Sequence, residues 1–135
     1  MQPVETEEEP AEHAPGRFEV PTGYEVLTGS SDGERRSVAV VVAKFNGEIT
    51  SRLLERALDT LEEEGVARNA VTVMPVPGAF ELPLAAIETG VPVSFGVLTT
   101  ETTEQAEARI DRAADAVRSG LEMADVFQQL RAAAR

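Results

Sequence analysis

A short run of mostly β-branched residues constrains the fold of this chain more than any other feature. Residues 38–43 read Val-Ala-Val-Val-Val-Ala. A continuous apolar run of this length is typical of a strand buried on both faces of a parallel sheet, because a strand with one wet face alternates between apolar and polar residues. Parallel neighbours must be joined by a crossover, which is usually a helix. The run therefore predicts an α/β fold.

The rest of the pattern continues as strands alternating with helices. A helix is expected from about residue 50 to residue 64, with Thr50 or Ser51 as its N-cap and Gly65 as its terminator. One face of that helix carries Leu53, Leu54, Ala57, Leu58 and Leu61. A second strand at 71–74, a short helix at 80–88 and a third strand at 93–98 follow. The last element is a long helix with apolar residues at spacings of four or three, namely Ile110, Ala114, Val117, Leu121, Ala124, Phe127 and Leu130. The order βαβαβα predicts a layered α/β fold.

The N-terminal part of the chain differs in composition from the rest. Residues 1–17 are rich in glutamate and contain three prolines, so we expect a disordered acidic tail followed by one domain over residues 18–135. Two short extended pieces, 18–20 and 24–27, are separated by Pro21 and Gly23 and predict an edge strand.

Charge and composition exclude several classes of partner and chemistry. The net charge is −12, of which residues 1–34 carry −8, and this sign argues against nucleic acid or an anionic membrane surface as a partner. Cysteine is absent, which excludes disulfides and thiolate chemistry. No apolar stretch approaches the ~20 residues of a membrane span. A soluble cytoplasmic protein is expected.

Ligands of such sheets gather beyond the carboxyl ends of the strands, so the loops after the strands are the candidate site. Three such loops are expected, at 44–47, 76–81 and 99–102. Each opens a helix, whose first backbone N–H groups favour an anion or a polar ring edge.

Individual residues in and near these loops allow more than one interpretation. Phe45 and Phe80 are either ligand-contacting rings or ordinary core aromatics. Glu81 is either a ligand contact or a favourable acid in the first turn of a helix. Arg109 and Arg112 are either anion ligands or solvated charges on a helix. Residue type and spacing leave these alternatives open.

Four ordered blocks carry a family resemblance. They are Ala43-Lys44-Phe45-Asn46 with Ile49-Thr50, then residues 76–83, then residues 90–101 with Glu104-Gln105-Ala106, and finally residues 121–125. Together they resemble the 6,7-dimethyl-8-ribityllumazine synthase family over about residues 24–131. The resemblance implies a three-layer αβα sandwich with a parallel, flavodoxin-like sheet. It also implies a transferase of riboflavin biosynthesis that condenses 5-amino-6-(D-ribitylamino)uracil with 3,4-dihydroxy-2-butanone 4-phosphate and needs no cofactor or metal.

The resemblance also implies roles for particular residues. Phe45 would stack on the pyrimidine ring with Asn46 beside it, and Phe95 would close the site from a neighbouring subunit. Arg109 matches the family arginine that holds the substrate phosphate, and Arg112 is a second candidate. The ribityl chain would be bound by Ala79, Phe80 and Glu81. The family forms homo-oligomers, which implies a pentamer or an icosahedral 60-mer here.

The chain departs from the family pattern between Ala86 and Ile87. A strand, a histidine-bearing loop and a helix are absent there, so the fold is expected to be shortened by at least one strand–helix unit, on the order of 30 residues. The single histidine, His13, lies in the acidic tail and matches no family position, so no catalytic residue is identified. Three interpretations follow: a shortened lumazine synthase, a non-catalytic lumazine- or flavin-binding protein, and a structural shell subunit.

Overall fold

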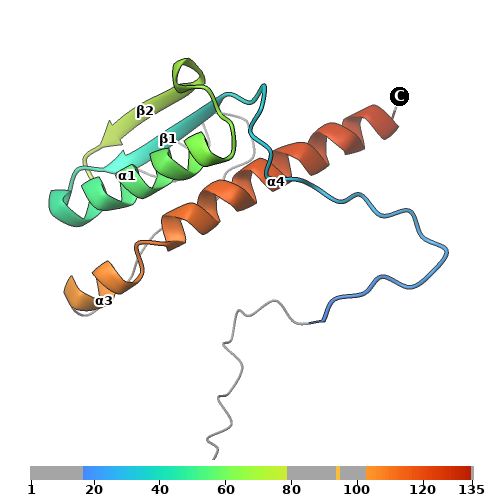
Figure 1. The fold of residues 1–135 in the computed structure, drawn as a ribbon, viewed down its shortest axis with the longest axis horizontal. Helices are drawn as coiled ribbons and strands as arrows, with labels where there is room; N and C mark the ends of the chain where they lie inside the picture. The colour runs from blue at the N-terminus through green and yellow to red at the C-terminus, as the bar shows by residue number, and fades with distance from the viewer. Residues whose placement is uncertain (1–16, 79–93, 95–102, 135) are drawn as a thin grey trace, which may run out of the picture.

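The computed structural model describes residues 17–78, 94 and 103–134, and the described part is an α/β structure. Its elements in chain order are β1 (Val38–Ala43), α1 (Gly47–Glu63), the 3-10 turn η1 (Arg68–Ala70), β2 (Val71–Val76), α3 (Thr103–Ala108) and α4 (Arg112–Ala133) (Figure 1). The predicted helix at 80–88 and the predicted third strand at 93–98 fall outside the described residues, apart from Ser94. All but the last residue of the predicted acidic tail also falls outside them.

Strands β1 and β2 form a parallel pair joined by α1. The register runs from Val38 opposite Val71 to Ala43 opposite Val76. The backbone N–H of Lys44 continues the ladder by donating to the carbonyl of Val76 at 2.8 Å. The first predicted strand is confirmed at both ends. The second extends past the predicted Met74 to Val76. Pro75 does not interrupt the ladder, because neighbouring residues in a strand direct their backbone polar groups to opposite edges and Val76 faces β1.

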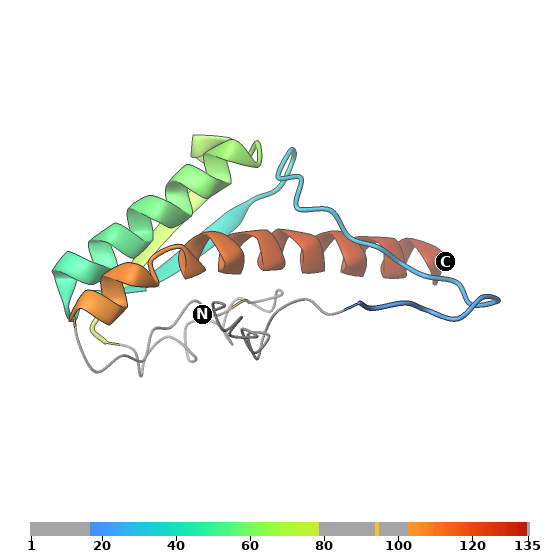
Figure 2. The ribbon, with the colours of Figure 1, turned by 60° about the horizontal axis from the view of Figure 1, so that its bottom comes forward.

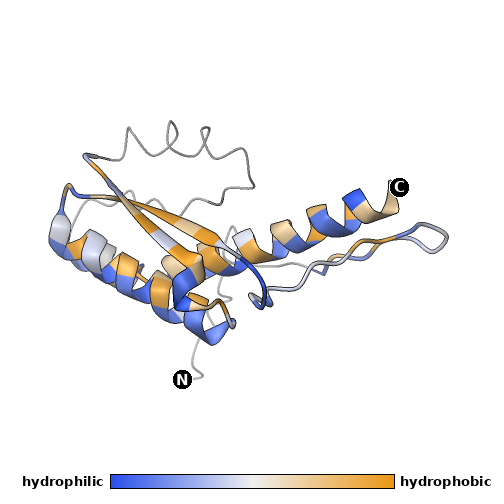
Figure 3. Cartoon of the chain, turned by 90° about the horizontal axis from the view of Figure 1, so that it is seen from above, coloured by the Kyte–Doolittle hydropathy of each residue, from blue (hydrophilic) through white to orange (hydrophobic). Residues whose placement is uncertain are grey.

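Helices α1 and α4 pack against each other and against one face of the sheet. The core cluster contains Leu61 from α1, Val66 from the loop after α1 and Leu121 from α4, and Val38 and Val40 of β1 pack against it. Helix α1 has a hydrophobic and a hydrophilic side, and the strands are largely hydrophobic (Figure 3). The prediction that β1 is buried on both faces is wrong for the described structure, in which none of its residues is fully buried. The described helices cover only the face that carries Val38 and Val40.

The start of α1 differs from the sequence-based prediction, whereas its end agrees with it. The helix begins at Gly47, and its N-cap is Asn46 in the left-handed conformation (φ 56°, ψ 49°), so Thr50 and Ser51 are interior residues. The predicted cap was wrong because the main-chain carbonyl of Asn46, rather than a hydroxyl, starts the helix. Gly65 is confirmed as the terminator: its φ is +90°, and Val66 N–H donates to the carbonyl of Leu61 at 2.9 Å, the pattern of a Schellman motif.

The C-terminal helical region is divided into α3 and α4. Ile110, predicted to lie on the long helix, is in the turn between them. In the first half of α4 the predicted apolar stripe is buried at Ala114 and Leu121. In the second half Phe127 and Leu130 are 36% and 52% exposed. The apolar stripe of α4 therefore contributes to the core only where α4 crosses α1.

Residues 28–33, here called the strap, tie the N-terminal segment to both helices. The carbonyl of Thr28 accepts from Gln129 of α4 at 2.8 Å, and Ser30 N–H donates to Asp125 at 2.9 Å. At the other end Gly33 N–H donates to the carbonyl of Glu64 at 2.6 Å. Gly29 packs so closely against the backbone carbonyl of Glu122 that a Cβ has no room there.

The edge strand predicted from residues 18–20 and 24–27 does not form, since the structure assigns no strand to residues 17–36. Phe18 and Tyr24 are 88% and 73% exposed. An isolated extended segment has no partner for its backbone polar groups, so local sequence pattern alone cannot make it a strand. In the described part of the chain, no helix combines the length and apolarity needed to cross a membrane.

Candidate functional site at the carboxyl end of the sheet

The carboxyl ends of β1 and β2, the start of α1 and helix α3 lie at one end of the structure. Both views of the ribbon show this arrangement (Figures 1 and 2), with the C-terminus of α4 at the opposite end. The loop 44–47 is fully described, and 76–78 are the described part of the second loop. Four predicted site residues, Ala79, Phe80, Glu81 and Phe95, lie outside the described residues, as does the loop 99–102.

Phe45 follows β1 directly and is 72% exposed. The interpretation of Phe45 as a core aromatic is therefore wrong for this chain. A solvent-exposed aromatic ring at the carboxyl end of a parallel sheet can stack on a planar ligand. Its neighbour Lys44 is fixed by the hydrogen bond to Val76, so the loops after β1 and β2 start from a fixed separation.

Asn46 orients the loop between Phe45 and α1. Its carbonyl accepts the N–H groups of Ile49 and Thr50 at 3.0 and 3.1 Å. Its side chain makes no capping hydrogen bond. Asparagine tolerates the left-handed region better than most residues. The side-chain amide of Asn46 is thus exposed next to Phe45 and is not committed to the cap.

The two predicted phosphate ligands lie at the junction of α3 and α4. Arg109 is in the turn and Arg112 is the first residue of α4, and both are exposed. The N–H of Arg112 donates to the carbonyl of Arg109 at 3.0 Å, which closes the turn. Asp111 lies between them in sequence and pairs with Arg56 of α1, Nε to Oδ1, at 3.0 Å. The turn that carries both arginines therefore lies toward the end of the molecule where β1 and β2 terminate (Figure 1).

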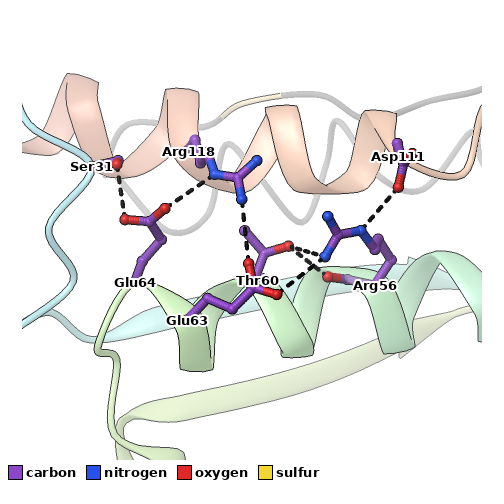
Figure 4. Close-up of polar contacts among 7 residues, drawn as sticks. All are labelled: Ser31, Arg56, Thr60, Glu63, Glu64, Asp111 and Arg118. Atoms are coloured by element: carbon purple, nitrogen blue, oxygen red, sulfur yellow. Dashed lines mark hydrogen bonds and ion pairs between the residues drawn. The ribbon is translucent and has the colours of Figure 1, made fainter.

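A chain of ion pairs links α1 to α4 and to the strap, and sequence analysis did not identify it. Figure 4 shows its members, which are Ser31, Arg56, Thr60, Glu63, Glu64, Asp111 and Arg118. Arg118 Nε lies 3.0 Å from Glu64, and its Nη2 lies 3.3 Å from Glu63. Ser31 donates to the other oxygen of Glu64 at 2.9 Å. Acid and base residues at helical spacing were the only sequence signal, and that signal does not identify the partners.

Within this chain of contacts Arg56 is held in its charged form. The hydrogen bond to Asp111 raises the pKa of Arg56 further above its usual value, and the negative charges of Glu63, Asp111 and Asp59 act in the same direction, while burial opposes them. Arg56 therefore serves as a fixed cation and not as a proton donor.

A polar cleft lies away from this site, where the strap meets the C-terminal half of α4. It has a volume of about 500 Å³ and is lined by Ser30, Asp32, Glu34, Arg35, Arg36, Asp125, Gln128 and Arg131. The three acids and three arginines cancel in charge, and Arg36 is paired with Asp125 at 3.4 Å. A ligand pocket is usually apolar with a few convergent polar groups, so this cleft is the weaker candidate. The part of the chain that is described holds no cluster of three or more metal-ligating side chains.

The family model described as 6,7-dimethyl-8-ribityllumazine synthase matches this chain in two segments. The segments are residues 35–88 and 85–128, which meet at 85–88. They run from just before β1 into the last third of α4 and cover more than half of the chain. Phe45 and Asn46 fall in the first segment, and Arg109 and Arg112 fall in the second. The chain therefore belongs to the 6,7-dimethyl-8-ribityllumazine synthase family.

Proposed function

We propose that this protein binds 5-amino-6-(D-ribitylamino)uracil at the carboxyl end of its sheet and condenses it with 3,4-dihydroxy-2-butanone 4-phosphate, in the cytoplasm. The reaction releases phosphate and water and closes the lumazine ring. The observation that carries the proposal is the exposed ring of Phe45 directly after β1, together with the carboxyl end of β1 lying at the same end of the molecule as the turn between α3 and α4 that bears Arg109 and Arg112. One loop suits a planar heterocycle, and the turn suits a phosphate.

Each group in the proposed site has a simple physical role. Phe45 stacks on the pyrimidinedione, and the exposed amide of Asn46 lies beside it. The guanidinium of Arg109, supported by Arg112, holds the phosphate of the ketone by charge-assisted hydrogen bonds. Ala79, Phe80 and Glu81 bind the ribityl chain, and Phe95 covers the site of a neighbouring subunit. Holding both reactants in one orientation lowers the barrier by removing translational and rotational freedom before reaction.

Part of the catalytic apparatus of the family is proposed to be missing. The family resemblance places a histidine-bearing loop in the segment lost between Ala86 and Ile87, and the match in two segments meeting at 85–88 supports an interruption there. His13, the single histidine, is distant in sequence from every predicted site residue. Positioning of the substrates is thus retained to a greater extent than acid–base catalysis. The same observation favours a second candidate function, binding of lumazine or a flavin-like ring without turnover.

Substitution of Phe45 tests the proposed binding site. Phe45→Ala is expected to raise the Kd for ribitylaminouracil about 5- to 10-fold, because a stacking contact contributes on the order of 1 kcal/mol. Tyr24→Ala is the matched control: Tyr24 is an aromatic of similar exposure, 73% against 72%, outside the proposed site. Calorimetric titration of the uracil alone measures both variants. Equal affinities for Phe45→Ala and the unmodified chain would remove Phe45 from the site.

We also propose that the chain self-associates, as a pentamer or as a larger shell. Support comes from the second half of α4, where Met123, Phe127 and Leu130 are 44%, 36% and 52% exposed and recur at helical spacing on one face. Sedimentation velocity at micromolar concentration is expected to show an oligomer, and Leu130→Asp is expected to shift it toward monomer. A solution of the unmodified chain that contains only monomer would contradict the proposal.

A further inference from the structure

The ion pair between Arg56 and Asp111 connects the proposed phosphate-binding turn to helix α1. Asp111 accepts from Arg56 Nε at 3.0 Å, across a separation of 55 residues in sequence. Its backbone carbonyl accepts the N–H of Ala114 at 3.0 Å, so the same residue begins α4. Asp111 therefore determines both where α4 starts and which part of α1 the turn lies against.

Arg56 is itself oriented by contacts within α1. Its Nη1 donates to the hydroxyl of Thr60 at 3.3 Å and lies 3.6 Å from Glu63. Thr60 is completely buried, and its hydroxyl donates to the carbonyl of Arg56 at 2.8 Å. A planar guanidinium that is held by its own helix in this way presents its Nε–H in one direction (Figure 4). Asp111 binds a preorganised donor.

We infer that Arg56 and Asp111 form a positioning pair that sets the location of Arg109 and Arg112 relative to Phe45. The inference rests on the proposed function. Phe45 lies two residues before the start of α1, and the two arginines flank Asp111, so both halves of the proposed site are connected through α1. Misplacement of a binding group by about 1 Å is enough to weaken a site severely.

Two observations distinguish positioning from a general contribution to stability. The side chain of Asp111 is 87% exposed, and ion pairs that are this open to water contribute little to folding. Farther along α4, Arg118 pairs with Glu63 and Glu64 and holds the helices together independently of Asp111. Loss of the Arg56–Asp111 pair therefore frees the turn while α4 stays packed on α1.

The direction in which one substitution changes the Kd of the ketone phosphate distinguishes positioning from simple electrostatics. Asp111→Asn removes a negative charge beside two arginines, so electrostatics alone predicts tighter phosphate binding. Positioning predicts weaker binding, and we expect the Kd for 3,4-dihydroxy-2-butanone 4-phosphate to rise about 10-fold. Asp115→Asn is the control, because it makes the same chemical change one helical turn later. It is expected to leave the Kd unchanged or to lower it slightly.

The experiment is a double-mutant cycle on the full chain. Calorimetry measures the Kd of the ketone phosphate and of ribitylaminouracil for Asp111→Asn, Arg56→Gln and the double variant. Each single change is expected to raise the Kd of the ketone phosphate by about the same factor, and the double variant is expected to raise it no further. The Kd of ribitylaminouracil is expected to stay constant in all three variants. Amide exchange should speed up at residues 109–114, while the urea midpoint of unfolding stays within error.

The possible results are distinguishable. Tighter ketone phosphate binding in Asp111→Asn, or additive losses in the double variant, would overturn the positioning pair while leaving the proposed function intact. If the unmodified chain binds no ketone phosphate, or if Arg109→Ala leaves its affinity unchanged, the proposed phosphate site is wrong and the positioning pair is overturned with it.

Discussion

Lumazine formation by the unmodified chain is expected to be about 10²- to 10⁴-fold slower than by a family member that retains the histidine-bearing loop. This range is the typical contribution of one positioned acid–base group. Binding of ribitylaminouracil is expected to be much less affected, because Phe45 and Asn46 are present and exposed at the carboxyl end of β1. The measurement is product absorbance with both substrates, beside a titration of the uracil alone.

The comparison of rate with affinity is informative because the two depend on different groups. A loss confined to kcat identifies missing transition-state interactions, whereas a parallel loss in Kd identifies a damaged binding site. Adding free imidazole is a useful control, since partial recovery of rate would assign the deficit to the histidine side chain that is proposed to be missing. Turnover at the level of an intact family member would show that neither the histidine nor its loop is required.

Truncation of Leu61 is expected to lower the free energy of unfolding by about 2–5 kcal/mol, the usual cost of Leu→Ala in a packed core. Leu61 is 1% exposed and lies where α1 meets the core residues Val66 and Leu121. Leu130→Ala makes the same change on α4 at a position that is 52% exposed in the single chain, and in the dissociated protomer it is expected to cost no more than about 0.5 kcal/mol. Urea titration at a fixed protomer concentration compares the two variants.

The contrast between the two leucines tests whether the described core is the real one. Similar losses for both variants would mean that the end of α4 is as well packed as α1, for example against a second subunit. Repeating the Leu130→Ala measurement at a tenfold lower protein concentration separates these cases, because stability that comes from association depends on protomer concentration.

The elements that were predicted correctly are those fixed by local chemistry. The run at 38–43 has the bounds of β1 because β-branched residues favour an extended chain and no turn former interrupts them. Gly65 ends α1 because its left-handed conformation is unfavourable for residues with a Cβ. The start of α1 was misplaced because Asn46 caps through its main chain, a role that carries no side-chain signature.

The Phe45 side of the candidate site could be predicted from the sequence, whereas the contact of the arginine-bearing turn with α1 depends on tertiary packing. The position of Phe45 after the apolar run at 38–43 indicates the candidate site, since the carboxyl ends of parallel strands lie at one edge. The contact between Arg56 and Asp111 exists only because α4 crosses α1 at one particular register. Sequence spacing cannot specify that register, so Asp111 could not be recognised beforehand.

The strap also has a consequence for synthesis on the ribosome. Ser30 and Thr28 make hydrogen bonds with Asp125 and Gln129, partners that follow 95 and 101 positions later in the chain. During translation β1, α1 and β2 emerge long before these partners, so the β–α–β unit can form first, with Ser31 and Gly33 of the strap on Glu64, while residues 28–30 stay undocked. Contacts of such long sequence separation are expected to form late in folding. A nascent chain arrested before Asp125 should therefore leave residues 28–30 open to proteases, and release of the finished chain should protect them.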